Sequence, residues 1–235
     1  MNIRAASLSE QIARHLADQI VRWELLPGAH LPELELAKQL DVSTNSLREA
    51  FRLLERQHLI EIQPRRGARV CDVTETQVRD LYDFLFLLLG ELAARAARLW
   101  QGEQMADLAA MLPQFERFHA ANDIAAAHDV AFGFVTIAVQ RFSANQYLAN
   151  DIEDLLPLLR RYSYLALKEE TSELSVSLAI FQNLLRNVLA RQAEAAAADI
   201  REYGDKQCQI VLRAVAKRAA ASPSLPCLWG NSPGG

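Results

Sequence analysis

A short amphipathic segment, a polar turn and a longer amphipathic segment follow one another over residues 33–57, and this order constrains the fold more than any other feature of the chain. Apolar residues recur at helical spacing in both segments, so each is predicted to be a helix with one buried face. Ser43 or Thr44 is well placed to cap the second helix. Residues 59–62 and 68–71 are predicted as two strands joined by a turn. Together these elements predict a winged helix-turn-helix.

The polar and basic side chains of this unit suit contact with DNA. The first turn of the longer helix would meet base edges in a major groove, and the arginines would reach phosphates, a guanine edge or a minor groove. Residues 43–70 hold six arginines and three glutamates, a net charge of +3 in a chain of net charge −4. Any one arginine is explained as well by an ordinary solvated face, but their order favours DNA. The predicted DNA-binding residues are Ser43, Thr44, Asn45, Ser46, Arg48, Arg52, Arg65, Arg66 and Gly67.

Helical spacing dominates the rest of the chain. Apolar residues at intervals of three and four predict a first helix over 7–23. Thr74 is a predicted N-cap with Gln77 as its capping-box partner, and six helices are expected after it, near 75–100, 103–120, 123–142, 146–167, 173–190 and 192–220. Pro113 and Pro157 should kink or split two of them. We expect a mainly α protein with a winged helix-turn-helix at 1–72, an all-α antiparallel helical bundle at 73–221 and a disordered tail at 222–235.

Composition and motifs argue against several other classes of protein. The longest apolar run, residues 84–89, is far shorter than the roughly 20 residues of a membrane span. The first residues lack the apolar core of a signal peptide, and three widely spaced cysteines favour a reducing compartment. We therefore expect a cytoplasmic protein with no membrane partner. The chain has no glycine-rich phosphate loop, no GxSxG and no HExxH, so an enzyme is not expected.

A set of residues between 31 and 70 matches a known family at consistent spacing. They are Leu31-Pro32-Glu33, Glu35-Leu36-Ala37, Leu40, Val42-Ser43, Arg48-Glu49-Ala50, Leu53-Leu54-Glu55, Leu59-Ile60, Pro64, Arg66-Gly67-Ala68 and Val70. Through them, residues 8–72 resemble the DNA-binding domain of the GntR family of bacterial regulators. The resemblance implies a homodimer that binds a short palindromic operator in double-stranded DNA.

Two positions depart from the family's pattern. Members usually carry a DNA-contacting arginine between the two glutamates of the second helix, where this chain has Leu34. They usually begin the recognition helix with Ser-Arg-Thr-Pro, where this chain has residues 43–46 without an arginine. A good bidentate base contact contributes about 1–3 kcal/mol of discrimination. We therefore expect an operator that differs from the usual family site, with Asn45 able to read an adenine.

The order of parts also resembles the FadR-type branch of the family, whose C-terminal FCD domain binds a small effector. Typical members place an Asp and a His four apart on one helix and two more His on later helices, which forms a metal site for a carboxylate ligand. The corresponding positions here are Phe132, Thr136, Phe181 and Tyr203. A second register puts Asp129 and Gly133 at the first pair, and His119 and His128 are the domain's only histidines. We expect no metal and no other cofactor.

The same positions suggest an apolar effector site. An arginine that pairs with ligand carboxylates in the family is replaced near Phe86. The predicted effector pocket is lined by Phe86, Phe132, Thr136, Phe181 and Tyr203, and its effector would be neutral or apolar. The alternative is that these aromatic residues fill the core and leave no cavity.

The resemblance and the residues together predict a dimeric, sequence-specific transcription regulator. Repression is favoured over activation, and control by a small molecule bound in the helical domain is expected. The alternative from another class is a helical ligand-binding or protein-interaction module whose DNA binding has weakened.

Overall fold

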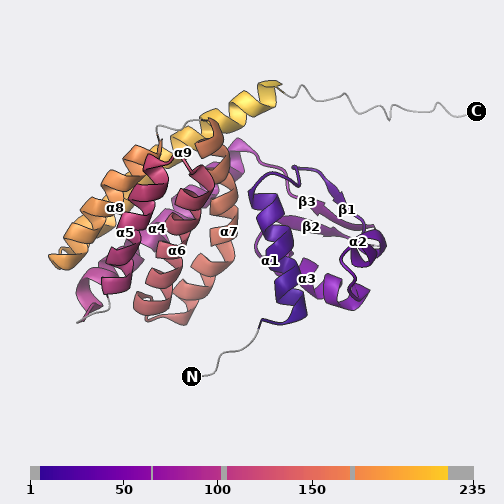
Figure 1. Ribbon diagram of the computed structural model, residues 1–235, viewed down its shortest axis with the longest axis horizontal. Helices are drawn as coiled ribbons and strands as arrows, with labels where there is room; N and C mark the ends of the chain where they lie inside the picture. Colours follow the sequence, from indigo (N-terminus) through magenta and orange to yellow (C-terminus); the bar gives the residue numbers. More distant parts are fainter. Residues whose placement is uncertain (1–5, 65, 102–104, 170–172, 222–235) are drawn as a thin grey trace, which may run out of the picture.

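The computed structural model describes residues 6–64, 66–101, 105–169 and 173–221. A small domain of helices and three strands is followed by a larger helical domain, and residues 71–74 connect them (Figure 1). This arrangement confirms the mainly α fold with a winged helix-turn-helix before a helical bundle. The tail predicted to be disordered, 222–235, lies outside the described residues.

The first domain places a small sheet beside three helices. Its elements are α1 (Leu8–Val21), β1 (His30–Leu31), α2 (Glu33–Gln39), α3 (Thr44–Arg56), β2 (Ile60–Gln63) and β3 (Gly67–Val70). Strand β3 lies in the middle and pairs antiparallel with both neighbours, with His30 opposite Arg69 and Ile60 opposite Val70. The β2–β3 hairpin is the predicted wing. Strand β1 was not predicted, because two residues are too few to show an alternating pattern.

Helices α1 and α3 pack against each other and carry the core of this domain. Ser7 caps α1, since its Oγ accepts a hydrogen bond from the Glu10 amide at 3.2 Å and its own amide donates to the Glu10 carboxylate. Leu16 of α1 and Leu47 and Leu54 of α3 are 1% exposed or less. Each such burial contributes about 1.5–3 kcal/mol, so the position of α3 is fixed by apolar packing on α1.

The prediction that the first helix extends to residue 23 was wrong. Helix α1 ends at Val21, and Trp23 has a left-handed backbone with φ of 61°. The indole turns towards the helical domain, where it is buried and its Nε1 donates to the Arg161 carbonyl at 3.0 Å. The apolar character of Trp23 therefore reflects contact between the two domains and not the buried face of α1.

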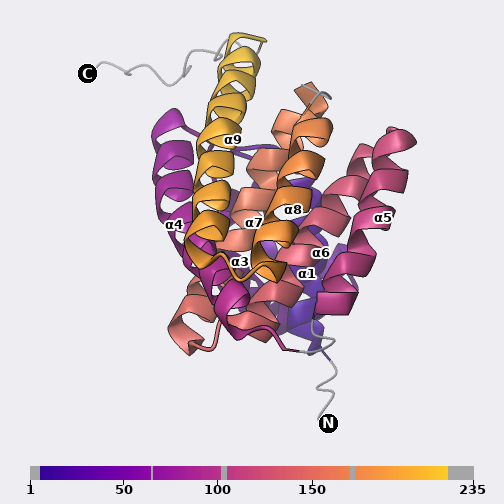
Figure 2. The ribbon, with the colours of Figure 1, turned by 90° about the vertical axis from the view of Figure 1, so that its left-hand side faces the viewer.

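The described residues of the second domain form six helices. They are α4 (Glu75–Leu99), α5 (Ala106–Ala120), α6 (Ile124–Phe142), α7 (Gln146–Glu169), α8 (Glu173–Leu189) and α9 (Ala193–Ala221). Helices α4 and α9 lie side by side and share the most extensive packing in the protein (Figure 2). The predicted capping box of Thr74 and Gln77 starts α4. Pro113 and Pro157 lie within α5 and α7, and neither helix is split.

The apolar run on α4 is divided between two faces of the helix. Leu85, Phe86 and Leu89 point into the bundle and are buried, whereas Phe84 and Leu87 are 48% and 57% exposed. Along the described ranges, no helix is both long enough and apolar enough to cross a membrane.

Candidate nucleic-acid interface and effector pocket

The first turn of α3 divides the four predicted polar DNA contacts into two pairs. Ser43 is the N-cap: its Oγ accepts from the Ser46 amide at 3.0 Å and lies 2.9 Å from the Ser46 hydroxyl. These two hydroxyls therefore fix the start of the helix. Thr44 and Asn45 occupy the first two helical positions, and Asn45 is exposed. Of the four, these two are best placed to meet base edges, because the cap does not use their side chains.

Two predicted DNA-binding arginines extend from the exposed face of α3 and form ion pairs with nearby glutamates. Arg48 is 60% exposed, and its Nε lies 2.8 Å from Glu33 Oε1 on α2. An ion pair through Nε is the arrangement that leaves the two terminal nitrogens of a guanidinium for a base or a phosphate. Arg52 is 66% exposed and pairs with Glu49 one turn earlier. These exposed pairs contribute little to stability, so they orient the arginines more than they bind them.

The wing tip is held against β1. Gly67 has φ of +92°, and a Cβ built on it would lie 2.4 Å from the Leu31 carbonyl oxygen. Glycine at this position is therefore required by the close approach of two strands, whether or not it also contacts DNA. Arg66 is exposed beside it, and His30 hydrogen-bonds the Arg66 carbonyl. The predicted DNA contact Arg65 lies outside the described residues.

A groove of about 640 Å³ separates α2, α3 and the wing. Its walls bring together the arginines of α3 and the wing tip with the start of α2, and include Glu33, Leu34, Arg48, Arg52, Arg66 and Gly67. The structure thus collects the basic residues predicted at separate positions of the sequence around a single concave surface.

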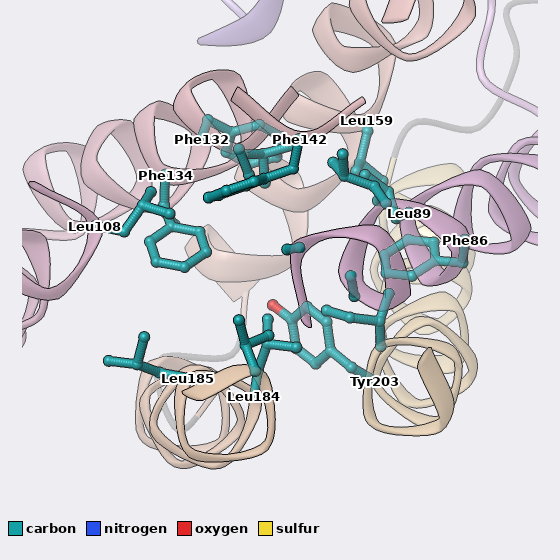
Figure 3. Close-up of a pocket in the computed structure, with 18 of the residues that line it drawn as sticks. Phe86, Leu89, Leu108, Phe132, Phe134, Phe142, Leu159, Leu184, Leu185 and Tyr203 are labelled. Atoms are coloured by element: carbon teal, nitrogen blue, oxygen red, sulfur yellow. The ribbon is translucent and has the colours of Figure 1, made fainter. Parts of the chain in front are cut away.

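The helical domain contains an apolar cavity of about 110 Å³ (Figure 3). All six helices contribute to its lining, which includes Phe86, Leu89, Leu108, Phe132, Phe134, Phe142, Leu159, Ser163, Leu184, Leu185, Tyr203 and Gln207. Three of the five predicted pocket residues, Phe86, Phe132 and Tyr203, lie in this lining. The alternative in which the aromatic residues fill the core and leave no cavity therefore does not hold.

The other two predicted pocket residues do not extend the lining. Thr136 is not among the described lining residues, and its hydroxyl donates to the Phe132 carbonyl one turn earlier at 3.0 Å. Thr136 therefore does not line this cavity, and its hydroxyl is hydrogen-bonded within α6. The side chain of Phe181 falls outside the described part of the chain. Leu159 and Ser163 on α7 were missed, because a helix with two apolar faces does not show which one borders a cavity.

Aromatic rings order one end of the cavity. Tyr82 and Phe86 stack on α4 with centroids 5.1 Å apart, and Phe86 meets Tyr203 of α9 edge-on at 6.1 Å. Figure 3 shows the Tyr203 hydroxyl directed into the cavity. Burial raises the pKa of Tyr82 well above its ordinary value, so this phenol stays neutral. The described lining includes no charged side chain, so this cavity suits a neutral guest.

His128 of α6 lies directly behind the cavity lining. Its ring packs on Phe132 with centroids 4.6 Å apart and is 3% exposed. The Ser163 hydroxyl donates to the Arg160 carbonyl at 3.2 Å, so His128 Nε2, 2.9 Å from Ser163 Oγ, is assigned as a donor. Burial lowers the pKa of His128 below its ordinary 6.5, which leaves the imidazole neutral at pH 7.

Among the described residues, no three His, Cys, Asp or Glu side chains form a group that could hold a metal ion.

Ion pairs join this part of the helical domain to the DNA-binding domain. Asp129 accepts from Arg160 at 2.7 Å and from Arg22 of the small domain at 3.3 Å, while Arg160 lies 3.9 Å from Asp18 of α1. The adjacent His128 ring, whose Nδ1 lies 4.0 Å from Asp129 Oδ1, and the guanidinium groups of Arg160 and Arg22 hold the pKa of Asp129 below its ordinary value. A cluster of opposite charges, which we call the junction cluster (Asp18, Arg22, Asp129 and Arg160), therefore links α1 to α6 and α7.

A buried arginine lies in the same junction between the domains. Arg161 of α7 is fully buried, and its Nη2 donates to the Cys71 carbonyl at 2.9 Å. Its guanidinium lies 5.4 Å from the Trp23 ring. Nε and Nη1 of Arg161 are buried with no hydrogen-bond partner among the described residues. At the end of α3, Arg56 forms a further ion pair with Asp154 of α7 at 3.0 Å.

Comparison with known proteins places this geometry in context. Residues 8–70 match the model described as bacterial regulatory proteins, gntR family, and residues 80–205 match that of the FCD domain. The chain is 24% identical over 212 residues to the HTH-type transcriptional repressor GlaR of Escherichia coli, across 86% of this chain and 95% of GlaR. It is 38% identical over 73 residues to the E. coli repressor RspR, across 31% of this chain and 32% of RspR.

A solved structure shows the same fold over nearly the whole chain. E. coli McbR/YncC superposes with a TM-score of 0.77 at 23% identity, covering 89% of this chain and 99% of that one. Two of the curated relatives are matched over only 52% and 32% of their own lengths. GlaR and RspR are both HTH-type transcriptional repressors. Because the FCD model spans more than half of the residues and the gntR model precedes it, the chain belongs to the gntR family of bacterial regulators that carry an FCD domain.

Proposed function

We propose that this transcription regulator represses its targets by binding a palindromic operator as a homodimer, and that a small neutral molecule in the helical domain controls this binding. The observation that carries the DNA-binding part is the groove between α2, α3 and the wing. It gathers Arg48, Arg52 and Arg66 beside the polar first turn of α3. A recognition helix with small polar residues at its start and arginines one turn on is suited to the major groove.

The contacts divide by chemistry. Thr44 and Asn45 are assigned to base edges, since Asn can form two hydrogen bonds with adenine. Arg52 and Arg66 are assigned to phosphates, which position the protein without reading sequence. Arg48, oriented by Glu33, is placed to reach a guanine edge or a phosphate. Because the chain carries leucine and threonine where relatives in the family usually carry arginines, the proposed operator differs from the usual family site.

The proposed effector is small, neutral and largely apolar. The cavity of about 110 Å³ is smaller than the about 150 Å³ of an apolar cavity known to hold benzene. A guest of the size of benzene or larger would therefore enter only as the lining helices move slightly apart. A charged carboxylate would lose its hydration without gaining a cationic partner from the described lining, which is unfavourable by several kcal/mol. No metal is proposed to take part.

The junction cluster supports a route for control. Phe132 and Ser163 line the cavity and hold His128, the sequence neighbour of Asp129. A guest that displaces α6 or α7 would shift Asp129 relative to Arg22 and so change how α1 and its partner α3 are held. The effector acts in this scheme only through unequal affinity for the two arrangements.

The test of DNA binding begins with selection of duplexes from random-sequence DNA by the full-length protein. We expect a palindromic site whose affinity falls steeply as salt rises. Arg48→Ala and Arg66→Ala should weaken binding at least tenfold. Arg98→Ala, an exposed arginine of the helical domain, is the matched control and should not. DNA affinity that is unchanged in both Arg48→Ala and Arg66→Ala would instead favour a helical ligand-binding or protein-interaction module.

Effector binding is tested with defined probes. In a thermal-shift panel, benzene, toluene and n-hexanol should raise the melting temperature, whereas succinate and malate should not. Stabilisation by the dicarboxylates alone would refute a neutral guest, and one-to-one binding of Zn²⁺ or Ni²⁺ by calorimetry would refute the metal-free site. Asp129→Asn should retain the thermal shift and lose the effect of the probe on DNA affinity. Asp107→Asn, which breaks an ion pair within the helical domain, is the control.

The homodimer is tested independently of the ligand. A palindrome presents the same half-site twice, so one protomer is expected on each half. Sedimentation of the free protein should give twice the 26.3 kDa of the chain. A monomer that stays monomeric on the selected duplex would refute this part of the proposal.

A further inference from the structure

The start of α2 presents an unusual apolar side chain to the groove. Leu34 is 68% exposed, and it lies in the first turn of a helix whose buried residue is Ala37. Scattered exposed leucines are ordinary on protein surfaces. Leu34 differs because it lines the same groove as Arg48 and Arg66, where most of the other exposed side chains are charged.

The geometry brings Leu34 to the same duplex as α3. Arg48 of α3 reaches across to Glu33, the residue before Leu34, at 2.8 Å. The first turn of α2 and the first turns of α3 therefore form one continuous edge. A duplex that meets Arg48 also meets the side chain of Leu34, because both border a single groove of about 640 Å³.

The chemistry of this edge favours a base over a phosphate. The isobutyl group of Leu34 cannot hydrogen-bond a phosphate, and the exposed carboxylate of Glu35 beside it disfavours close approach of the phosphate backbone. Within the major groove, the edges of the four bases present donors, acceptors and a single apolar group, the C5-methyl of thymine. An isobutyl side chain can therefore bury apolar surface in the major groove only by packing against that methyl group.

We infer that Leu34 is a specificity-determining residue that selects a thymine in each half-site by contact with its C5-methyl group. This inference rests on the proposed DNA binding and names a feature of the operator. Burial of one methyl contributes enough for about a fourfold change in affinity per half-site.

The test replaces thymine by uracil, which removes only the methyl. The probe is the duplex that the full-length protein selects from random-sequence DNA, resynthesised with deoxyuridine at one thymine position at a time. We expect one position per half-site at which uracil weakens binding about three- to fivefold. At that position, a C·G pair should also bind weakly and 5-methylcytosine should restore part of the affinity.

Variants assign the effect to the side chain. Leu34→Ala should bind the dT and dU duplexes equally, while Leu8→Ala, an exposed leucine of α1 outside the groove, should keep the discrimination. A dU effect that persists in Leu34→Ala, or a selected duplex that tolerates uracil everywhere, would overturn the role of Leu34 and leave DNA binding intact. Failure to select any sequence would overturn both proposals.

Discussion

Two glycines on the facing helices α4 and α9 should respond to alanine with opposite signs. Gly204 of α9 is packed against Phe86: a Cβ built on it would lie 2.4 Å from Phe86 Cγ, 2.5 Å from Cδ1 and 2.8 Å from Cβ. Gly90 of α4 has room, since its Cβ would meet the Ala197 carbonyl oxygen at 3.4 Å and the Arg201 side chain at 3.5 Å. The two sites share one helix–helix interface, so they form a matched pair.

The magnitudes follow from helix propensity and packing. Alanine in place of glycine inside a helix stabilises it by about 1 kcal/mol. At Gly90 this gain remains, because the new contacts are ordinary van der Waals distances. At Gly204, carbon atoms that prefer about 3.5–4.0 Å would be forced roughly 1 Å closer. Overpacking of this kind costs about 1–3 kcal/mol, and because one clashing atom is the Phe86 Cβ, a rotation of the ring cannot relieve it.

Thermal unfolding of the full chain, followed by circular dichroism, measures both effects. A change of 1 kcal/mol shifts the melting temperature by about 2–4 °C in a protein of this size. Gly90→Ala should raise the melting temperature by about 2–3 °C, and Gly204→Ala should lower it. Gly204→Ala should also weaken any guest of the cavity, since Phe86 lines it. A Gly204→Ala protein as stable as Gly90→Ala would refute the packing at this interface.

Three further substitutions test the wing, the buried histidine and the junction. Gly67→Ala, which puts a Cβ at 2.4 Å from a strand carbonyl, should lower DNA affinity at least tenfold in a binding titration, and wild-type affinity would contradict the wing geometry. The folded-state pKa of His128 lies below 6.5, so the unfolded chain binds more protons and stability is lost as pH falls from about 6.5. His128→Gln should therefore reduce the change in urea midpoint between pH 7 and pH 5.5. His15→Gln, at an exposed histidine, is the control and should leave that change as it is. Arg161→Met should raise the free energy of unfolding, measured by urea titration, by about 1 kcal/mol, because the cost of a buried cation without an anionic partner exceeds the gain from its contact with Trp23. A lower free energy of unfolding would show that the contact prevails.

The sequence predicted the architecture because each element carries its own local signal. The capping-box pair Thr74 and Gln77 predicts the start of α4, and the spacing of apolar residues in α1 and α3 predicts one buried face on each helix. Where an apolar residue serves a contact between domains, the same signal misleads. Trp23 continued the helical spacing of α1 but packs on α7, and nothing local distinguishes these two outcomes.

The sequence predicted which types of residue form the candidate site but only some of the particular residues. Phe86 and Tyr203 lie in the cavity, yet Thr136 on the same predicted surface turns its hydroxyl to its own backbone. Ser43 and Ser46 are predicted DNA contacts, and in the structure their side chains also hydrogen-bond within the helix cap. Side-chain competition for local backbone partners decides such cases, and it depends on rotamers that spacing does not encode.

The ion pairs across the domain junction also change what a salt titration of this protein measures. Arg22–Asp129, Arg56–Asp154 and Arg160–Asp18 are all partly exposed, so added electrolyte screens them. Raising salt then weakens the contact between the two domains. At the same time it reduces the free energy gained when counterions are released from the duplex. The slope of log affinity against log salt is therefore a sum of two linked equilibria. Counting phosphate contacts from that slope requires a protein in which Asp18, Asp129 and Asp154 have been neutralised.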